Sequence, residues 1–228
     1  MIEQAHEIYN GGDFKTAYKL YTHLADNGNA DAQTSLAYMH QQAQGCEVND
    51  AKSLELYTKA SEAKQSFALF NLAILYANGL GGVNHDQFKA YELFMEAATR
   101  EVAPAMYEVG LMLEQGLGCI QNYSEAAFWY EEGAKRGNIE CFNNLGVLYK
   151  EGHGVSQDDA RAFICFSRAS EGELAEGYYN LGMLYDQGRG CEESNDRALD
   201  LCRKAAYKGH QKAKDIIKNL QENGSIVF

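Results

Sequence analysis

Basic residues are scarce in this sequence, and they never gather in a run. The 228 residues include 20 lysines and arginines against 32 aspartates and glutamates, which leaves a formal net charge of −12 at pH 7. A surface this acidic repels the phosphates of nucleic acids and of anionic membranes. We therefore expect a protein that binds neither nucleic acid nor an anionic membrane surface.

Long apolar segments are missing as well. No stretch of the sequence approaches the ~20 apolar residues that a helix needs to span a bilayer. The opening residues, MIEQAHEIYN, contain neither the basic region nor the apolar run of a secretory signal. We expect no insertion into a membrane and a cytoplasmic location, or a periplasmic or secreted one if a signal was removed.

Metal-ligand patterns are a third absence. The sequence has no Cys-x-x-Cys pair, and its six histidines show neither i,i+4 pairing nor a His-Glu-x-x-His pattern. Zinc sites and metalloprotease sites are built on such spacings. We therefore expect no metal site and no cofactor. The histidines are His6, His23, His40, His85, His153 and His210.

What the sequence does contain is a repeat. The segment IECFNNLGVLYKEGHGVSQD, residues 139–158, recurs in related form from residues 30, 66, 104 and 175. Its central apolar residue returns at spacings of 36, 37, 36 and 36, and one extra glycine, Gly82, explains the 37. A fixed period of this length indicates an array of identical supersecondary units. These anchor residues are Leu36, Leu72, Val109, Leu145 and Leu181.

Each unit is predicted to form two helices joined by a glycine turn. The turn holds pairs such as Gly152 and Gly154, which adopt positive φ without steric cost. A column of preferred N-cap residues then marks the start of the second helix. The predicted fold is all-α, a right-handed α/α superhelix (solenoid) of helix-turn-helix repeats of about 36 residues. The N-cap column is Asn49, Asp86, Asn122, Asp158 and Ser194.

The two ends of the chain differ from the repeats. Residues 1–29 are predicted to form a shorter, tetratricopeptide-like hairpin that caps the array, with its turn at Gly11, Gly12 and Asp13. Residues 30–210 hold five full units. Residues 211–228 are predicted to be a capping helix, KAKDIIKNLQ, followed by a frayed tail, ENGSIVF.

The six cysteines occupy places that do not favour disulfides. Cys46, Cys119 and Cys191 follow the last glycine of the turn in alternate units. Two units of a solenoid are about 20 Å apart at ~10 Å per helix layer, which is far beyond disulfide reach. Cys141 opens a first helix, and Cys165 and Cys202 lie in second helices. Free thiols in a reducing compartment are the favoured interpretation.

Three segments of the repeats resemble a known family. The segments IECFNNLGVLYKEGHGV, AEGYYNLGMLYDQGRGC and SEAAFWYEEGAKRGN resemble the Sel-one-like repeat, a relative of the tetratricopeptide repeat with a longer turn. The resemblance implies an adaptor that holds protein complexes together and is not an enzyme. One cysteine-rich, secreted branch pairs cysteines across helix ends and is proposed to bind penicillin. The cysteines here lie elsewhere, so those features do not transfer.

One motif keeps an enzymatic alternative open. Ser61 and Lys64 form Ser-x-x-Lys, the nucleophile motif of penicillin-interacting enzymes, which suggests a hydrolase of β-lactam or cell-wall substrates. Ser61, however, falls at a position where other repeats have a small residue that packs between helices, and the companion motifs of these enzymes are missing. We expect no catalytic residue. Self-assembly through the end caps is a further alternative.

A column of polar residues just before the anchors points to a binding face. On a helix this position points away from the stripe that packs between units. In the tetratricopeptide superhelix that side faces the concave groove, where asparagines of matching motifs bind peptide backbone. Neither Asn144 nor Asn180 is expected to pack between units. The column is Ser35, Asn71, Glu108, Asn144 and Asn180.

Two further sets accompany this column. An apolar row three residues on comprises Tyr38, Ile74, Leu111, Val147 and Met183. An acidic rim is formed by residues such as Glu140, Glu151 and Glu176. One interpretation is a groove with backbone-reading amides, an apolar floor and acidic walls, which binds a basic or neutral peptide or partner helix. The other is that the asparagines merely tolerate a solvated helix face and the apolar row is half-buried.

Overall fold

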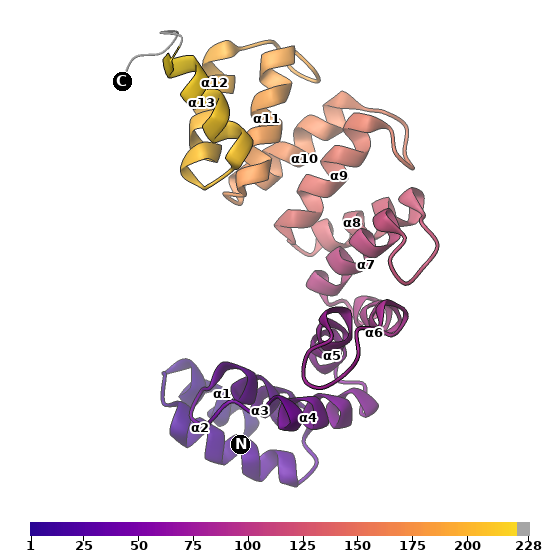
Figure 1. The fold of residues 1–228 in the computed structure, drawn as a ribbon, viewed down its shortest axis with the longest axis vertical. Helices are drawn as coiled ribbons and strands as arrows, with labels where there is room; N and C mark the ends of the chain where they lie inside the picture. The colour runs from indigo at the N-terminus through magenta and orange to yellow at the C-terminus, as the bar shows by residue number, and fades with distance from the viewer. Residues whose placement is uncertain (223–228) are drawn as a thin grey trace. The chain divides into compact units, whose positions relative to one another are not determined.

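The computed structural model describes residues 1–222 and shows an all-α protein (Figure 1). Over this part of the chain the backbone forms thirteen helices and no strand. The predicted frayed tail begins at Glu222, which instead ends the last helix, and residues 223–228 lie outside the described residues. The helices are α1 (Ile2–Asn10), α2 (Phe14–Asp26), α3 (Ala30–Gln42), α4 (Asp50–Glu62), α5 (Ser66–Asn78), α6 (Gln87–Thr99), α7 (Ala103–Gln115), α8 (Tyr123–Lys135), α9 (Ile139–Glu151), α10 (Asp159–Glu171), α11 (Ala175–Gln187), α12 (Asn195–Tyr207) and α13 (Gln211–Glu222).

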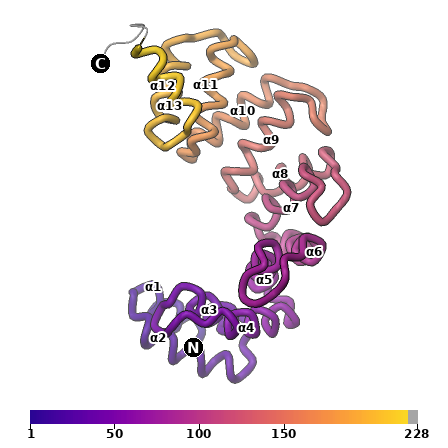
Figure 2. Tube along the Cα trace, in the orientation of Figure 1, coloured from indigo at the N-terminus to yellow at the C-terminus, as the bar shows by residue number. Residues whose placement is uncertain are grey.

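The helices divide between two compact units. The first unit is Met1–Gln121 and holds α1–α7, while the second begins at Asn122 and holds α8–α13. Within each unit every helix packs on the helix before it and the helix after it. The trace in Figure 2 follows this helix–turn–helix order along the chain. The predicted solenoid fold of short helical repeats is confirmed.

The predicted second-helix N-caps are confirmed at all five positions. In each, the side-chain oxygen accepts a hydrogen bond from the backbone N–H three residues on, as Asp158 does from Arg161 at 2.9 Å. Such a bond satisfies one of the amides that the first helical turn leaves without a partner. The sequence pattern therefore fixes where α4, α6, α8, α10 and α12 begin.

The glycine turns have two separate roles. The first glycine ends the first helix in the left-handed conformation, as Gly152 does after α9 with φ 74°. The second lies against the start of the preceding repeat's second helix: a Cβ at Gly154 would collide with the backbone of Tyr123 and Ser124. Ser124 Oγ also donates to Gly154 O at 2.8 Å. This turn therefore joins neighbouring repeats as well as reversing the chain.

The core is made of alanines, leucines and large aromatic side chains such as Tyr130 and Phe166. The anchor residue Leu145 is 5 % exposed, and the glycine that follows it lies against α10. A Cβ at Gly146 would be 2.7 Å from Phe166 Cε1, so close helix packing requires glycine there. The close approach at Gly146 is to α10, the second helix of the same repeat.

Candidate functional site

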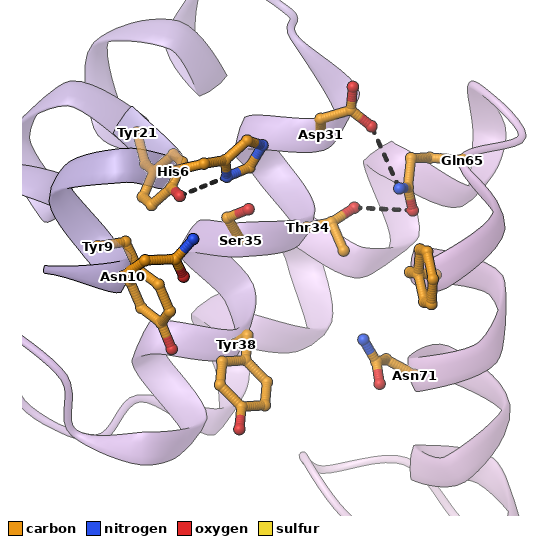
Figure 3. Close-up of a pocket in the computed structure, with 11 residues that line it drawn as sticks. His6, Tyr9, Asn10, Tyr21, Asp31, Thr34, Ser35, Tyr38, Gln65 and Asn71 are labelled. Carbon is orange, nitrogen blue, oxygen red and sulfur yellow. Dashed lines mark hydrogen bonds between the residues drawn. The ribbon is translucent and has the colours of Figure 1, made fainter. Parts of the chain in front are cut away.

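A groove in the first unit brings together three of the residues predicted to form the binding face. Its volume is about 510 Å³, and Ser35, Tyr38 and Asn71 all line it (Figure 3). Side chains from α1, α3 and α5 form most of its wall. The full lining is His6, Tyr9, Asn10, Tyr21, Asp31, Thr34, Ser35, Tyr38, Gln65, Phe67 and Asn71.

Helical spacing explains why these side chains share one groove. Asp31, Ser35 and Tyr38 are separated by four and three residues, so they lie on one face of α3. Phe67 and Asn71 are four residues apart and lie on one face of α5. Figure 3 shows Asp31 at one end of the α3 row and Tyr38 at the other, with Asn71 across the groove.

Gln65 fixes the distance between α3 and α5. Its Oε1 caps α5 by accepting from the N–H of Ala68 at 2.6 Å, and it also accepts from Thr34 Oγ1 at 3.1 Å. Its Nε2 donates to Asp31 Oδ1 at 3.2 Å. One side chain therefore starts a helix and ties it to the first helix of the preceding repeat.

Tyrosines form the wall on the α1 side. Tyr21 Oη lies 2.6 Å from His6 Nδ1, and Tyr9 Oη donates to Gln44 Oε1 at 2.6 Å. Burial raises the pKa of both Tyr9 and Tyr21, so both phenols stay neutral at physiological pH. Tyr38 remains 42 % exposed. The groove thus offers aromatic surface and neutral hydroxyl groups.

Asn71, like Asn10, offers a carboxamide that a ligand can reach. It is half-buried, and within residues 1–222 its carboxamide has no hydrogen-bond partner. A carboxamide can donate to a backbone carbonyl and accept from a backbone amide at the same time. This side chain therefore has the capacity to pair with an extended peptide of any sequence.

The other two asparagines predicted for the face take part in an amide chain within the second unit. Asn180 Nδ2 donates to Asn143 Oδ1 at 2.9 Å, and Asn143 Nδ2 donates to Asn144 Oδ1 at 3.2 Å. Asn144 Nδ2 then donates to Tyr130 Oη at 3.2 Å. The expectation that neither side chain packs between repeats is wrong for both, because Asn180 bonds from α11 to α9 and Asn144 bonds from α9 to α8 of the preceding repeat.

Asn180 also lines a second groove, of about 740 Å³, at the C-terminal end of the second unit. Glu176 from the predicted acidic rim lies in it too. Tyr179 stacks on His210 with ring centroids 4.2 Å apart, and Lys208 Nζ lies 2.6 Å from Glu173 Oε2. This groove carries charges of both signs, whereas charged side chains in the first groove are few.

The remaining predicted residues lie outside both grooves. Val147 packs against the core cluster around Phe166, and Met183 lines a separate hollow beside Ile216 and Leu220. Burial raises the pKa of Glu108, which is half-buried. Ile74 and Leu111 are half-buried, Glu140 is exposed, and Glu151 is exposed and paired with Lys150 at 3.0 Å. Apart from Tyr38, the apolar row is therefore half-buried.

The sequence reasoning missed several groove residues. His6 and Tyr9 come from the N-terminal hairpin, and Gln65 and Phe67 come from the start of α5. The available signal was the first-helix N-cap column, in which Asn29, Gln65 and Asn138 cap α3, α5 and α9 through their side chains.

The residues of the Ser-x-x-Lys motif make ordinary structural contacts. Ser61 Oγ donates to Thr58 O at 2.8 Å within its own helix, and Lys64 Nζ lies 4.0 Å from Glu96 Oε1. Across residues 1–222 no group of three or more histidine, cysteine, aspartate or glutamate side chains is placed to hold a metal ion. None of the helices described here combines the length and apolar character needed to cross a membrane.

The six cysteines are unpaired in the described chain. The three that follow the turn glycines share one contact, in which the thiol donates to the carbonyl seven residues earlier. Cys119 Sγ makes this bond to Met112 O at 3.4 Å, and Cys46 and Cys191 make it to Met39 and Leu184. Burial raises the pKa of Cys141 to about 12 and that of Cys165 to about 11.

These pKa shifts predict slow thiol chemistry in the folded protein. The thiolate is the reactive form, and a raised pKa leaves little of it at pH 8. With Ellman's reagent and no reductant, all six thiols should titrate in denaturant. In native buffer Cys141, Cys165 and Cys202 should react much more slowly than the other three. Two or fewer free thiols in denaturant would contradict unpaired cysteines.

Comparison with known proteins places this geometry in a family. A family model described as the Sel1 repeat matches five times, at residues 30–64, 66–101, 103–138, 143–173 and 175–210. Among curated proteins, the chain is 33 % identical over 122 residues to chitin synthase regulatory factor 3 of Schizosaccharomyces pombe, covering 53 % of this chain and 13 % of that protein. It is 29 % identical over 143 residues to an exopolysaccharide production negative regulator of Rhizobium meliloti, covering 57 % of this chain and 53 % of that protein.

Solved structures agree with these matches. A Sel1 repeat protein from Oxalobacter formigenes has a TM-score of 0.91 at 26 % identity, covering 97 % of this chain and 88 % of that one. The protective antigen c5321 of uropathogenic Escherichia coli has a TM-score of 0.86 at 24 % identity, covering 97 % and 48 %, and this likeness concerns the fold alone. The chain matches 13 % of the length of the Schizosaccharomyces pombe protein and 53 % of the length of the Rhizobium meliloti protein. Because the Sel1 model matches five repeats and the solenoid fold is shared, the chain belongs to the Sel1 repeat family.

Proposed function

We propose that this chain is a non-catalytic adaptor that binds an extended segment of a partner protein in the groove of its first unit. The observation that carries the proposal is the free carboxamide of Asn71 beside a half-exposed tyrosine, Tyr38, in a groove of about 510 Å³. The relatives named as regulators support a role in regulation through protein contacts. The partner is a protein or peptide of basic or neutral character. Self-association is compatible with this role.

The groove has the chemistry that a peptide site requires. A ligand-binding groove is mostly apolar and has a few convergent polar groups that fix orientation. Here the rings of Tyr9, Tyr38 and Phe67 supply apolar surface, and Asn71 supplies the backbone-reading amide. The bonds of Gln65 to Asp31 and Thr34 link α3 and α5, which favours a groove formed before the ligand arrives. A preformed site avoids part of the entropic cost of binding.

Removal of the Asn71 carboxamide should weaken binding of the partner without lowering the stability of the fold. A lost hydrogen bond in a desolvated groove costs ~1–3 kcal/mol, so Asn71→Ala should lower affinity by about 5-fold to 150-fold. Its thermal stability should stay near wild type, because the carboxamide has no partner inside the described protein. The partner is first identified by affinity capture with mass spectrometry, and then measured by calorimetry.

Asn84→Ala is the matched control, because Asn84 is an exposed loop residue outside the groove. It should leave both affinity and stability unchanged. If Asn71→Ala binds the captured partner as tightly as wild type, the partner does not use this groove.

The asparagines of the second unit should behave differently from Asn71. Asn144→Ala combined with Asn180→Ala breaks the amide chain and leaves Tyr130 and Asn143 with fewer partners. Each lost bond should cost about 0.5–1.5 kcal/mol of stability. If a partner also occupies the second unit, its affinity should fall tenfold or more in calorimetry. A double variant with wild-type stability would contradict the hydrogen-bond chain, and unaltered affinity would exclude the second unit as a binding face.

A further inference from the structure

The charges of the first groove carry a more specific inference than peptide binding in general. Among its lining residues Asp31 is the one carboxylate, and no lysine or arginine lines it. Within residues 1–222 Asp31 makes no ion pair, and its one hydrogen bond is the contact from Gln65 Nε2 to Oδ1. Its Oδ2 is therefore left for a ligand. The whole chain, at −12, adds to the negative potential of the groove.

An aromatic ring lies at the same end of the groove as this carboxylate. The Gln65–Asp31 contact brings the start of α5 to Asp31, and Phe67 is the second residue of α5. Phe67 is 55 % exposed although it is a large apolar side chain at the mouth of a groove. An exposed ring and a carboxylate without an ion pair, lining one groove, suit a planar cation. The ring face attracts the charge, and the carboxylate accepts its hydrogen bonds.

We propose that this end of the groove is a specificity pocket for an arginine side chain of the bound segment. The guanidinium stacks on Phe67 and donates to Asp31 Oδ2, while the peptide backbone runs past Asn71. Arginine fits better than lysine because its guanidinium is flat, weakly hydrated and able to stack and donate together. This inference rests on the proposed function, since it names the ligand chemistry of the same groove.

The test uses four short peptides of the form acetyl-Ala-Ala-Xaa-Ala-Ala-amide, with arginine, citrulline, lysine or glutamate at Xaa. Citrulline has the shape of arginine without its charge. Binding is followed from the backbone amide shifts of ¹⁵N-labelled full-length protein. The arginine peptide should shift the amides of Asp31, Phe67 and Asn71, and it should bind about fivefold to tenfold more tightly than the citrulline peptide. The glutamate peptide should bind most weakly.

Two variants assign this preference to the proposed residues. Asp31→Asn keeps the shape of the side chain and should reduce the arginine-to-citrulline ratio to nearly one. Phe67→Leu keeps an apolar side chain without a ring and should reduce the ratio about twofold or more. Asp50→Asn, at an exposed acid on α4 outside the groove, should leave the ratio unchanged.

The outcomes separate this inference from the proposed function. If the arginine and citrulline peptides bind equally while both shift groove amides, the arginine pocket is overturned and peptide binding in the groove stands. If the ratio survives Asp31→Asn, the preference arises elsewhere and the inference is again overturned. Absence of shifts with every peptide overturns it too, and the proposed function is then judged separately by the captured partner and Asn71→Ala.

Discussion

Replacement of Leu145 by alanine is expected to lower the free energy of unfolding by about 2–5 kcal/mol. The side chain is 5 % exposed and lies at the anchor position of α9, directly before the glycine that contacts α10. The loss combines the transfer free energy of the missing atoms with the cavity that they leave. Because each repeat is coupled to its neighbours alone, unfolding should also become less cooperative. Urea denaturation followed by circular dichroism measures both effects.

Ile164→Ala is the matched control for this substitution. Ile164 is 59 % exposed on α10, so its truncation should change stability by no more than about 0.5 kcal/mol. A loss below about 1 kcal/mol for Leu145→Ala, with an unchanged transition, would mean that Leu145 does not anchor the repeat as the structure places it.

A second large effect is expected at the turn glycine that joins neighbouring repeats. Gly154→Ala places a methyl group against the backbone of Tyr123 and Ser124 at φ 69°. Left-handed strain and overpacking together should cost about 2–5 kcal/mol. Gly137→Ala is the matched case, because Gly137 has φ 84° and open space around the position of a Cβ. It should cost about 1–2 kcal/mol, from backbone strain alone.

The comparison between these two glycine variants isolates the contact between repeats. Both variants are measured by thermal and urea unfolding under identical conditions. The difference between them reports the collision with the preceding repeat, since the backbone strain is common to both. Equal stabilities would show that the turn relaxes away from Tyr123 without cost, and that this glycine serves chain reversal alone.

Much of the fold could be predicted because its determinants are local. The cap at Asp158 and the left-handed Gly152 each depend on a few neighbouring positions. Because the sequence repeats, each local prediction applies at the equivalent position of every repeat. The division into an N-terminal cap, five repeats and a C-terminal cap stays a prediction, since the two compact units divide the chain elsewhere.

The candidate site could be predicted only in part. Ser35, Tyr38 and Asn71 follow from their columns, because helical spacing alone sets the face on which they lie. Tyr9 and Phe67 depend on how α1 and α5 approach α3, and that approach is set by packing between repeats. Asn143 was missed for a different reason.

The column of Asn143 gives no polar signal, since its equivalents are chemically mixed. Its role depends on two partners, Asn144 and Asn180, whose orientations only the packed helices determine. The equivalents in the other repeats are Thr34, Phe70, Tyr107 and Tyr179.

The central claim is that a partner segment lies in the groove of the first unit, and site-specific photo-crosslinking tests it most directly. A benzophenone amino acid replaces Tyr38 inside the groove or, in a separate protein, Phe88, which is 73 % exposed and lies outside it. Each protein is irradiated with the partner found by affinity capture, and cross-linked peptides are mapped by mass spectrometry. The account predicts one contiguous partner segment joined to position 38, lost on Asn71→Ala, and no such segment joined to position 88. Equal cross-linking from both positions, or from position 88 alone, would contradict it.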